Sequence, residues 1–226
     1  MAQPTEQNSA QQQPHSPEAL LAALLATTEH RILPQTRAGM AAGNRVFGAA
    51  ILDSAHLQPL CTATNEGTVS PILHGEMNCI QKFFTEVYPD AATRPHTGAE
   101  CIFYATHEPC SLCLSGITWA GFTKIFYLFT YEDSRDGFAM PLDLDILEQV
   151  YKVKASRESD SDYQKRPLYN KSNKFFVAVS CAELLEQIAD EGDKQKWGTE
   201  VQRIKGLYAE LSKRYADAEK SAALPL

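Results

Sequence analysis

The centre of the chain reads HGEMNCIQKFFTEVY (residues 74–88), ECIFYA (100–105), CSLCLSGITWA (110–120) and KIFYLF (124–129), in that order. The first and third stretches have the length of helices, and in the first the apolar residues lie three to four positions apart. The second and fourth are short apolar runs, as expected of buried strands. Helices that alternate with buried strands predict a three-layer α/β domain.

The alternation extends to both sides of this central part. Ser16 followed by Pro17 has the pattern of an N-cap and a first helical residue, and Pro34 is expected to interrupt the helix that begins there. The further predicted elements are a helix over 17–30, a hairpin of strands over 46–53 and 58–64, and a helix over 142–151.

Composition divides the chain into four segments. Residues 1–16 are rich in Gln, Pro and Ser and predict a disordered tail, because they contain too few apolar side chains to offset the cost of ordering. Residues 17–155 form the α/β domain, and the polar, charged residues 156–174 predict a linker. Residues 175–226 predict a C-terminal helical extension.

Two capping boxes are predicted in this extension, Ser180-x-x-Glu183 and Thr199-x-x-Gln202. The second is expected to open a helix with one apolar stripe, formed by Val201, Ile204, Leu207, Tyr208 and Leu211. Packing of this helix on the main domain or on a dimer mate is the simpler interpretation, and a partner-binding helix is the alternative.

The 226 residues carry a net charge of −7, and the sequence pI is about 5.4. An acidic chain is a poor match for a phosphate backbone, so nucleic acid is not expected as the main partner. The apolar run Ala19–Ala26 is too short to cross a membrane. The first thirty residues contain no Lys or Arg, which argues against a secretory signal or a transit peptide. We therefore expect a cytoplasmic protein.

Two short motifs contain the residues suited to chemistry. His74-Gly75-Glu76 begins one predicted helix, and Pro109-Cys110-Ser111-Leu112-Cys113 begins the next. Cys110 and Cys113 are three positions apart and so face the same side of a helix. One histidine and two cysteines suit Zn²⁺, and three protein ligands leave a fourth position open, as in catalytic zinc sites.

Glu76 is the candidate catalytic residue. It lies two positions from His74, where its carboxylate need not bind the metal but can reach water held there and move protons. A C-x-x-C pair by itself also occurs in redox and structural metal sites, and H-x-E by itself occurs by chance. The two motifs together, each at the start of a helix, favour the catalytic interpretation.

The joint pattern resembles the zinc-dependent cytidine deaminase superfamily, whose signature is H-x-E followed by P-C-x-x-C. The resemblance covers roughly residues 40–152. It implies an α/β/α sandwich around a mixed five-stranded sheet, zinc on His74, Cys110 and Cys113, Glu76 as the proton shuttle, and at least a homodimer.

Finer matches point in different directions within the superfamily. Glu108-Pro109-Cys110 resembles guanine and tRNA adenosine deaminases, and the segment 113–120 resembles the C-L-G-A-I-Y-W-A segment of bacterial-type guanine deaminases. His74-Gly75-Glu76 is closer to fungal cytosine deaminase.

Residues 46–51 resemble the P-F-G-A-V strand of nucleobase deaminases. In those enzymes an asparagine at the position of Asn65 hydrogen-bonds the base, although here the loop from Asn65 to His74 is two residues shorter.

Three more residues are candidate substrate contacts. Phe47 is either a core residue or a base contact. Trp119 is either a core residue or a wall of the base pocket. Asp133 resembles the aspartate that contacts the purine in guanine deaminases, and the alternative is a solvated acidic loop with Glu132 and Asp136.

The leading hypothesis is a hydrolytic deaminase of a free nucleobase or small nucleoside, with guanine or another aminopurine preferred. The alternatives are a cytosine-type deaminase, a tRNA adenosine deaminase, and a non-catalytic, zinc-stabilised interaction module.

Overall fold

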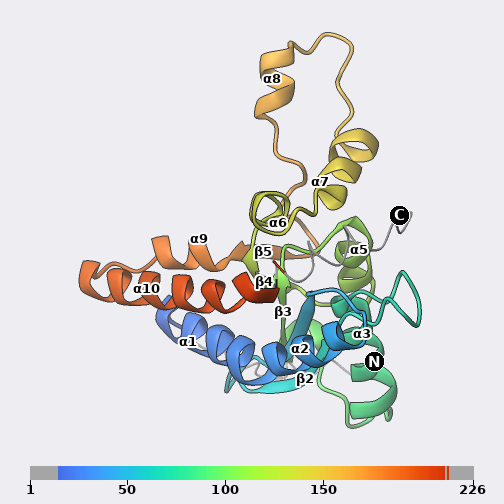
Figure 1. Ribbon diagram of the computed structural model, residues 1–226, viewed down its shortest axis with the longest axis vertical. Coiled ribbons are helices and arrows are strands. Elements are labelled where there is room, and N and C mark those ends of the chain that lie inside the picture. Colours follow the sequence, from blue (N-terminus) through green and yellow to red (C-terminus); the bar gives the residue numbers. More distant parts are fainter. Residues whose placement is uncertain (1–14, 212, 214–226) are drawn as a thin grey trace, which may run out of the picture.

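The computed structural model describes residues 15–211 and 213, and Figure 1 shows their arrangement. A five-stranded sheet has the order β2-β1-β3-β4-β5. β1 is antiparallel to β2 and β3, whereas β3, β4 and β5 are parallel to one another, so the predicted mixed sheet is confirmed. The strands are β1 (Gly48–Asp53), β2 (Pro59–Thr64), β3 (Cys101–His107), β4 (Lys124–Phe129) and β5 (Val177–Ser180).

Helices cover both faces of the sheet. Ala50 and Leu52 of β1 pack in one hydrophobic cluster with α1, α9 and α10, while their neighbours Ala49 and Ile51 pack in a second cluster with α3 and α5. Successive strand residues face opposite sides, so one strand supports two layers of helices. The predicted three-layer α/β/α sandwich is confirmed. Its covering helices are α1 (Pro17–Thr27), α3 (Gly75–Lys82), α5 (Ser111–Trp119), α9 (Cys181–Glu186) and α10 (Glu191–Leu207).

The remaining helices include several π-helical turns. The first helix does not stop before Pro34: it continues through a π turn into α2, because the wider turn accommodates the proline. In Figure 1, α7, η3 and α8 project away from the sheet. These elements are η1 (Thr28–Ile32), α2 (Leu33–Ala41), η2 (Phe83–Val87), α4 (Thr97–Glu100), α6 (Tyr131–Phe138), α7 (Leu142–Ile146), η3 (Leu147–Tyr151) and α8 (Asp160–Lys165).

The C-terminal segment departs from the sequence-based expectation in two ways. Residues 177–180 form the edge strand β5 and pair with β4, because four residues are too few to show a strand pattern in sequence. The capping box predicted at Thr199 is wrong, since α10 begins after Asp190 and the Thr199 hydroxyl donates to the Gln195 carbonyl inside the helix. The box at Ser180 is confirmed.

Two further expectations concern the ends of the domain. Ser16 caps α1 as predicted. Residues 1–14 of the predicted tail lie outside the described residues. Among the residues that the structure describes, no helix is both long and apolar enough to cross a membrane.

Candidate metal and catalytic site

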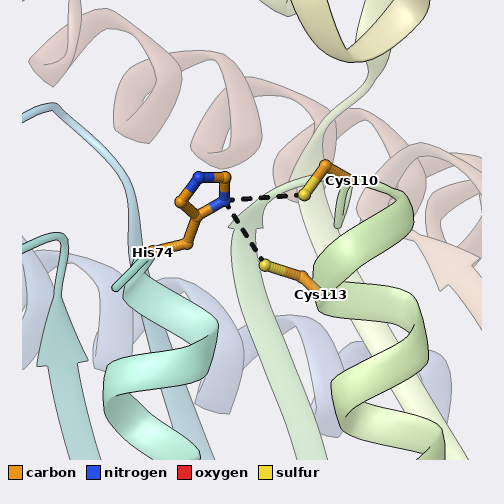
Figure 2. A group of neighbouring side chains, drawn as sticks. All are labelled: His74, Cys110 and Cys113. Carbon is orange, nitrogen blue, oxygen red and sulfur yellow. Dashed lines mark hydrogen bonds between the residues drawn. The ribbon is translucent and has the colours of Figure 1, made fainter. Parts of the chain in front are cut away.

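Two neighbouring helices begin at the predicted metal ligands. His74 is the N-cap residue of α3, and Cys110 is the N-cap residue of α5. Cys113 follows in the first turn of α5, so both sulfurs face His74 from the same helix (Figure 2). The free N–H groups and the dipole at these helix starts favour anionic thiolate ligands.

The three side chains form a compact donor set. The His74 Nδ1 lies 3.5 Å from the Cys110 Sγ and 3.6 Å from the Cys113 Sγ, and all three atoms lie within 4.8 Å of one another. Zn–N bonds of about 2.0–2.1 Å and Zn–S bonds of about 2.3 Å in a tetrahedral site place nitrogen and sulfur roughly 3.5–3.6 Å apart. The arrangement therefore fits tetrahedral zinc.

Cys110 is the thiol most easily deprotonated. A hydrogen bond from Cys113, and then contact with His74, lower the pKa of Cys110 to about 4 despite its burial. The pKa of Cys113 shifts upward, because its proton is held by the Cys110 sulfur and because the thiol is buried. The Cys110 contact also raises the pKa of His74. The site thus favours negative charge on sulfur, which a metal cation would neutralise.

Glu76 stands beside this donor set in a buried position. It is only 6% exposed, and it interacts with the Cys113 side chain. Burial, and then the negative charge of Cys110, raise the pKa of Glu76 to about 7. A carboxyl group with a pKa near neutrality can both take up and release a proton, which is what a proton shuttle must do.

Gly75, between His74 and Glu76, allows α3 to approach the sheet closely. A Cβ at this position would lie 2.9 Å from the carbonyl oxygen of Phe47 and 2.9 Å from the Cα of Gly48. Any larger residue would have to push the start of α3 away from β1.

Asn65 is buried at the end of β2, but most of its hydrogen-bonding capacity is used inside the protein. Its Oδ1 accepts from the backbone N–H groups of Arg45 and Gly67, each at 3.1 Å, and its Nδ2 donates to the Leu73 carbonyl at 3.4 Å. Asn65 therefore holds the shortened loop to His74. One N–H of the amide remains for another acceptor.

Trp119 and Phe47 have different surroundings. Trp119 is 89% exposed at the end of α5, so the first of its two predicted alternatives, a core position, is wrong, and a contact with the base stays a prediction. Leu114 and Ile117 face the core, and a position two residues beyond Ile117 faces away from it on a helix. Phe47 is half-buried, with its ring edge against the ring of His107 at 4.9 Å between centroids.

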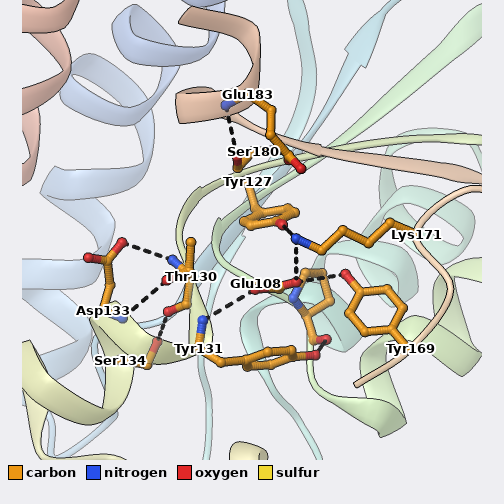
Figure 3. A network of polar contacts seen from close by, with 11 residues as sticks. Glu108, Tyr127, Thr130, Tyr131, Asp133, Ser134, Tyr169, Lys171, Ser180 and Glu183 are labelled. Carbon is orange, nitrogen blue, oxygen red and sulfur yellow. Dashed lines mark hydrogen bonds and ion pairs between the residues drawn. The ribbon is translucent and has the colours of Figure 1, made fainter. Parts of the chain in front are cut away.

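Asp133 is engaged inside the protein rather than free in a loop. Its carboxylate accepts from the Thr130 N–H in the capping box of α6 and forms an ion pair with Lys205 at 2.7 Å (Figure 3 shows the Thr130 contact). Asp133 thus bonds to the start of α6 and to α10. Among the described residues, no contact joins it to the metal donors.

The sequence analysis missed Asp143, on α7. Burial, and then the negative charge of Cys110, raise its pKa to about 6, whereas His74 and Arg45 act in the opposite direction. Asp143 therefore lies within electrostatic range of the donor set. Nothing in the pattern Leu-Asp-Leu-Asp distinguishes it from a surface helix.

Glu108 holds the loop that leads to Cys110 (Figure 3). Its side chain is 3% exposed, accepts from the Tyr169 hydroxyl at 2.8 Å and from the Tyr131 N–H at 3.2 Å, and pairs with Lys171 at 3.4 Å. The Tyr131 hydroxyl donates to the carbonyl of Pro109. The end of the predicted linker thus contacts the metal-binding loop.

A cavity of 680 Å³ opens next to Glu108. Its walls include Tyr131, Tyr169, Lys152 and Lys171, and none of the three metal donors. It is therefore separate from the donor set.

Fold and donor set together define a class of protein: an α/β/α domain in which one histidine and two cysteines are arranged as zinc ligands would be, with a buried glutamate beside them. Residues 23–129 match the family model of the cytidine and deoxycytidylate deaminase zinc-binding region. The predicted resemblance to this deaminase superfamily is therefore confirmed over these residues, and zinc is confirmed as the cofactor that the matched region and the donor set indicate.

Several solved structures are similar to the chain. Guanine deaminase from Bacillus subtilis is 24% identical, with a TM-score of 0.46, over 68% of this chain and 86% of that one. Guanine deaminase from Nitrosomonas europaea is 18% identical, with a TM-score of 0.40, over 82% and 93%. A structure from work on A-to-I editing by tRNA:A34 deaminases is 17% identical, with a TM-score of 0.39, over 66% and 92%. No curated protein matches the chain in a sequence search.

Proposed function

We propose that this protein is a zinc-dependent hydrolytic deaminase of a free nucleobase or small nucleoside, with guanine or another aminopurine preferred. The observation that carries the proposal is Glu76: a carboxyl group that is 6% exposed and contacts Cys113 in the donor set. A site that only stabilises the fold has no use for a buried acid at this place, because burying an unpaired carboxyl group is costly.

Bound zinc supplies Lewis acidity, which activates water as a nucleophile at neutral pH. Glu76 accepts a proton from that water as the oxygen attacks the amino-bearing ring carbon, and then donates it to the adjacent ring nitrogen. Glu76 then takes the proton of the newly attached hydroxyl and passes it to the amino group, so that the C–N bond breaks and the products are ammonia and a ring carbonyl. One carboxyl group with a pKa near 7 serves both directions of transfer.

Two groups support recognition of a purine ring. The remaining N–H of Asn65 can donate to a ring acceptor without adding charge. The Asp143 carboxylate, within electrostatic range of His74 and Cys110, suits a ring edge that presents N–H donors, as guanine does. In this proposal Asp143 takes the role that sequence resemblance suggested for Asp133.

A cytosine-type deaminase is the second candidate. It is favoured by the contacts of Asp133, which pair this aspartate with Lys205 and Thr130 and so remove the sequence-based argument for a purine contact. Homodimer formation and a cytoplasmic location complete the proposal, as expectations from the resemblance and from the composition.

The test is ammonia release by zinc-loaded protein from guanine, adenine, cytosine, their nucleosides and pterins, with Glu76→Gln as the matched inactive control. Turnover of guanine that Glu76→Gln abolishes supports the proposal. Turnover of cytosine alone supports the second candidate. Full zinc binding with no turnover of any substrate in the panel contradicts both and favours the non-catalytic module.

A further inference from the structure

The end of α10 packs against a cluster of aromatic rings that includes His107, three residues before Cys110. The rings of His107 and Phe129 stack at 4.7 Å with an angle of 20°. Phe138 meets both edge-on, at 4.8 Å from His107 and 5.1 Å from Phe129. Tyr208, directly after α10, closes the cluster at 5.3 Å from Phe129 and 6.0 Å from His107. Such edge-to-face contacts hold rings at defined angles.

His107 connects this cluster to Phe47, which is a candidate base contact on the sequence evidence. Its ring meets Phe47 edge-on, and its Nδ1 lies 3.0 Å from the hydroxyl of Thr106. Thr106 in turn bonds to both backbone groups of Gly48, at 3.1 Å each. His107 therefore contacts the segment 47–48, whose backbone lies against Gly75 at the start of α3.

Packing, rather than polar contacts, holds the outer side of the His107 ring. The Nε2 of His107 is buried and has no hydrogen-bond partner among the described residues, whereas the buried hydroxyl of Tyr208 interacts with the side chains of Thr36 and Thr106. The position of the His107 ring thus depends on the rings that surround it. Of these, only Tyr208 comes from the C-terminal segment.

A second contact aligns α10 with the same cluster. Lys205 forms an ion pair with Asp133 at the start of α6, and its Nζ lies 5.1 Å from the centroid of the Phe129 ring. Lys205 and Tyr208 are three positions apart and so lie on one side of the helix. The end of α10 is thereby held at two points.

We propose that Tyr208 and His107 are positioning residues for Phe47, so that the C-terminal segment controls the shape of one wall of the substrate pocket without touching substrate. The proposal rests on the proposed function and on the sequence-based expectation that Phe47 is a contact of the bound base. It gives the C-terminal segment a role in substrate binding in addition to its packing on α1 and α9.

The experiment compares Tyr208→Leu, which removes the ring, with Tyr208→Phe, which keeps the ring and removes only the hydroxyl. Val201→Ala is the matched control, because Val201 is equally buried on the same helix and makes none of these ring contacts. We measure KM, kcat and zinc content, and also hydrogen–deuterium exchange in residues 44–50.

We expect Tyr208→Leu to raise KM by about tenfold with kcat within about twofold and zinc retained, because the wall loosens while the reacting groups stay in place. Exchange in 44–50 should rise. Tyr208→Phe should restore both values, and Val201→Ala should lower the melting temperature without changing KM.

An unchanged KM in Tyr208→Leu, or an equal rise in Val201→Ala, overturns the positioning role. If the wild-type protein turns over no substrate, the proposed function fails, and the exchange measurement alone decides the present proposal. Unchanged exchange in residues 44–50 of Tyr208→Leu then overturns it.

Discussion

At the scale of single residues, the position of Glu76 depends on its neighbour Gly75. The lack of a side chain at residue 75 lets α3 begin against the backbone of Phe47 and Gly48. This close approach brings His74 and Glu76, the two neighbours of Gly75, to the end of the central strand β3, after which α5 begins. A small residue thus lets the Glu76 carboxyl group and the His74 side chain lie close to the cysteines of the donor set.

Glu76→Gln should leave zinc content and folding unchanged and lower kcat by ~10²–10⁴-fold, the usual contribution of general acid–base catalysis. The amide keeps the shape of the side chain but cannot accept and return a proton. Metal analysis and steady-state kinetics on the same preparation check this. A variant that keeps more than about a tenth of the wild-type rate would falsify the shuttle role.

His107 makes a prediction about stability and pH. Burial lowers its pKa from the usual 6.5 to about 3. Between these two pH values the ring is therefore neutral in the folded protein and protonated in the unfolded chain. The neutral ring therefore stabilises the fold fully above pH 6.5, and this stability is lost as pH falls from 6.5 toward 3. The slope is at most about 1.4 kcal/mol per pH unit for one proton.

Urea unfolding at pH 7 and pH 5 measures this loss. The free energy of unfolding should fall less between the two values in His107→Phe than in the wild type, because the variant lacks the titrating group. His30→Gln is the control, since the His30 side chain is 70% exposed. Equal losses in wild type and His107→Phe would show that His107 does not titrate on unfolding.

At the scale of secondary-structure elements, the donor set is divided between two helices that pack side by side. α3 contributes His74, and α5 contributes Cys110 and Cys113. Each helix places its ligand at the N-terminus, where free N–H groups favour negative charge. A bound ion should therefore stabilise the α3–α5 pair as a unit.

Cys113→Ala should lose zinc and lower the melting temperature, because the binding energy of a metal ion adds to folding stability when the site forms only in the folded state. Cys61→Ala removes another buried thiol, which lies outside the donor set, and serves as the control. Zinc content by metal analysis and thermal unfolding with and without chelator are the measurements. Full zinc content in Cys113→Ala would contradict the assignment of this ligand.

At the scale of the whole molecule, tertiary contacts place Asp133 and Asp143 in different surroundings, although both are aspartates in the same part of the sequence. Asp133 pairs with Lys205, 72 residues away in sequence, and caps α6. Asp143 lies on the projecting part of the chain, yet its charge interacts with His74 and Cys110. Asp133 thus connects α6 to the C-terminal helix, whereas the charge of Asp143 acts on the donor set.

Asp143→Asn should lower turnover of guanine by ~10–100-fold and that of cytosine less, because one charge-assisted hydrogen bond contributes roughly 1.5–3 kcal/mol. Asp133→Asn should instead lower the free energy of unfolding by up to about 1 kcal/mol and leave substrate preference unchanged. Kinetics on both substrates and denaturant unfolding of both variants separate the two roles. The reverse result would restore Asp133 as the purine contact.

The sequence alone was enough to predict the layered α/β/α fold and the grouping of His74, Cys110 and Cys113 with Glu76 beside them. These features depend on short-range patterns: the spacings within H-x-E and C-x-x-C, and the helical and strand periodicities that surround them. Phe103 and Ile125, for example, are apolar within short runs, and they pair in the centre of the sheet as the pattern predicts.

Only the tertiary structure decided which residues surround that site. The edge strand β5, the exposure of Trp119, the pairing of Asp133 with Lys205 and the nearness of Asp143 to the metal donors all depend on which distant segments meet. Glu108 and Tyr169 are 61 residues apart, and no local period relates them. Their contact forms because the buried carboxylate needs hydrogen-bond donors, which the folded chain supplies from whichever segment lies beside it.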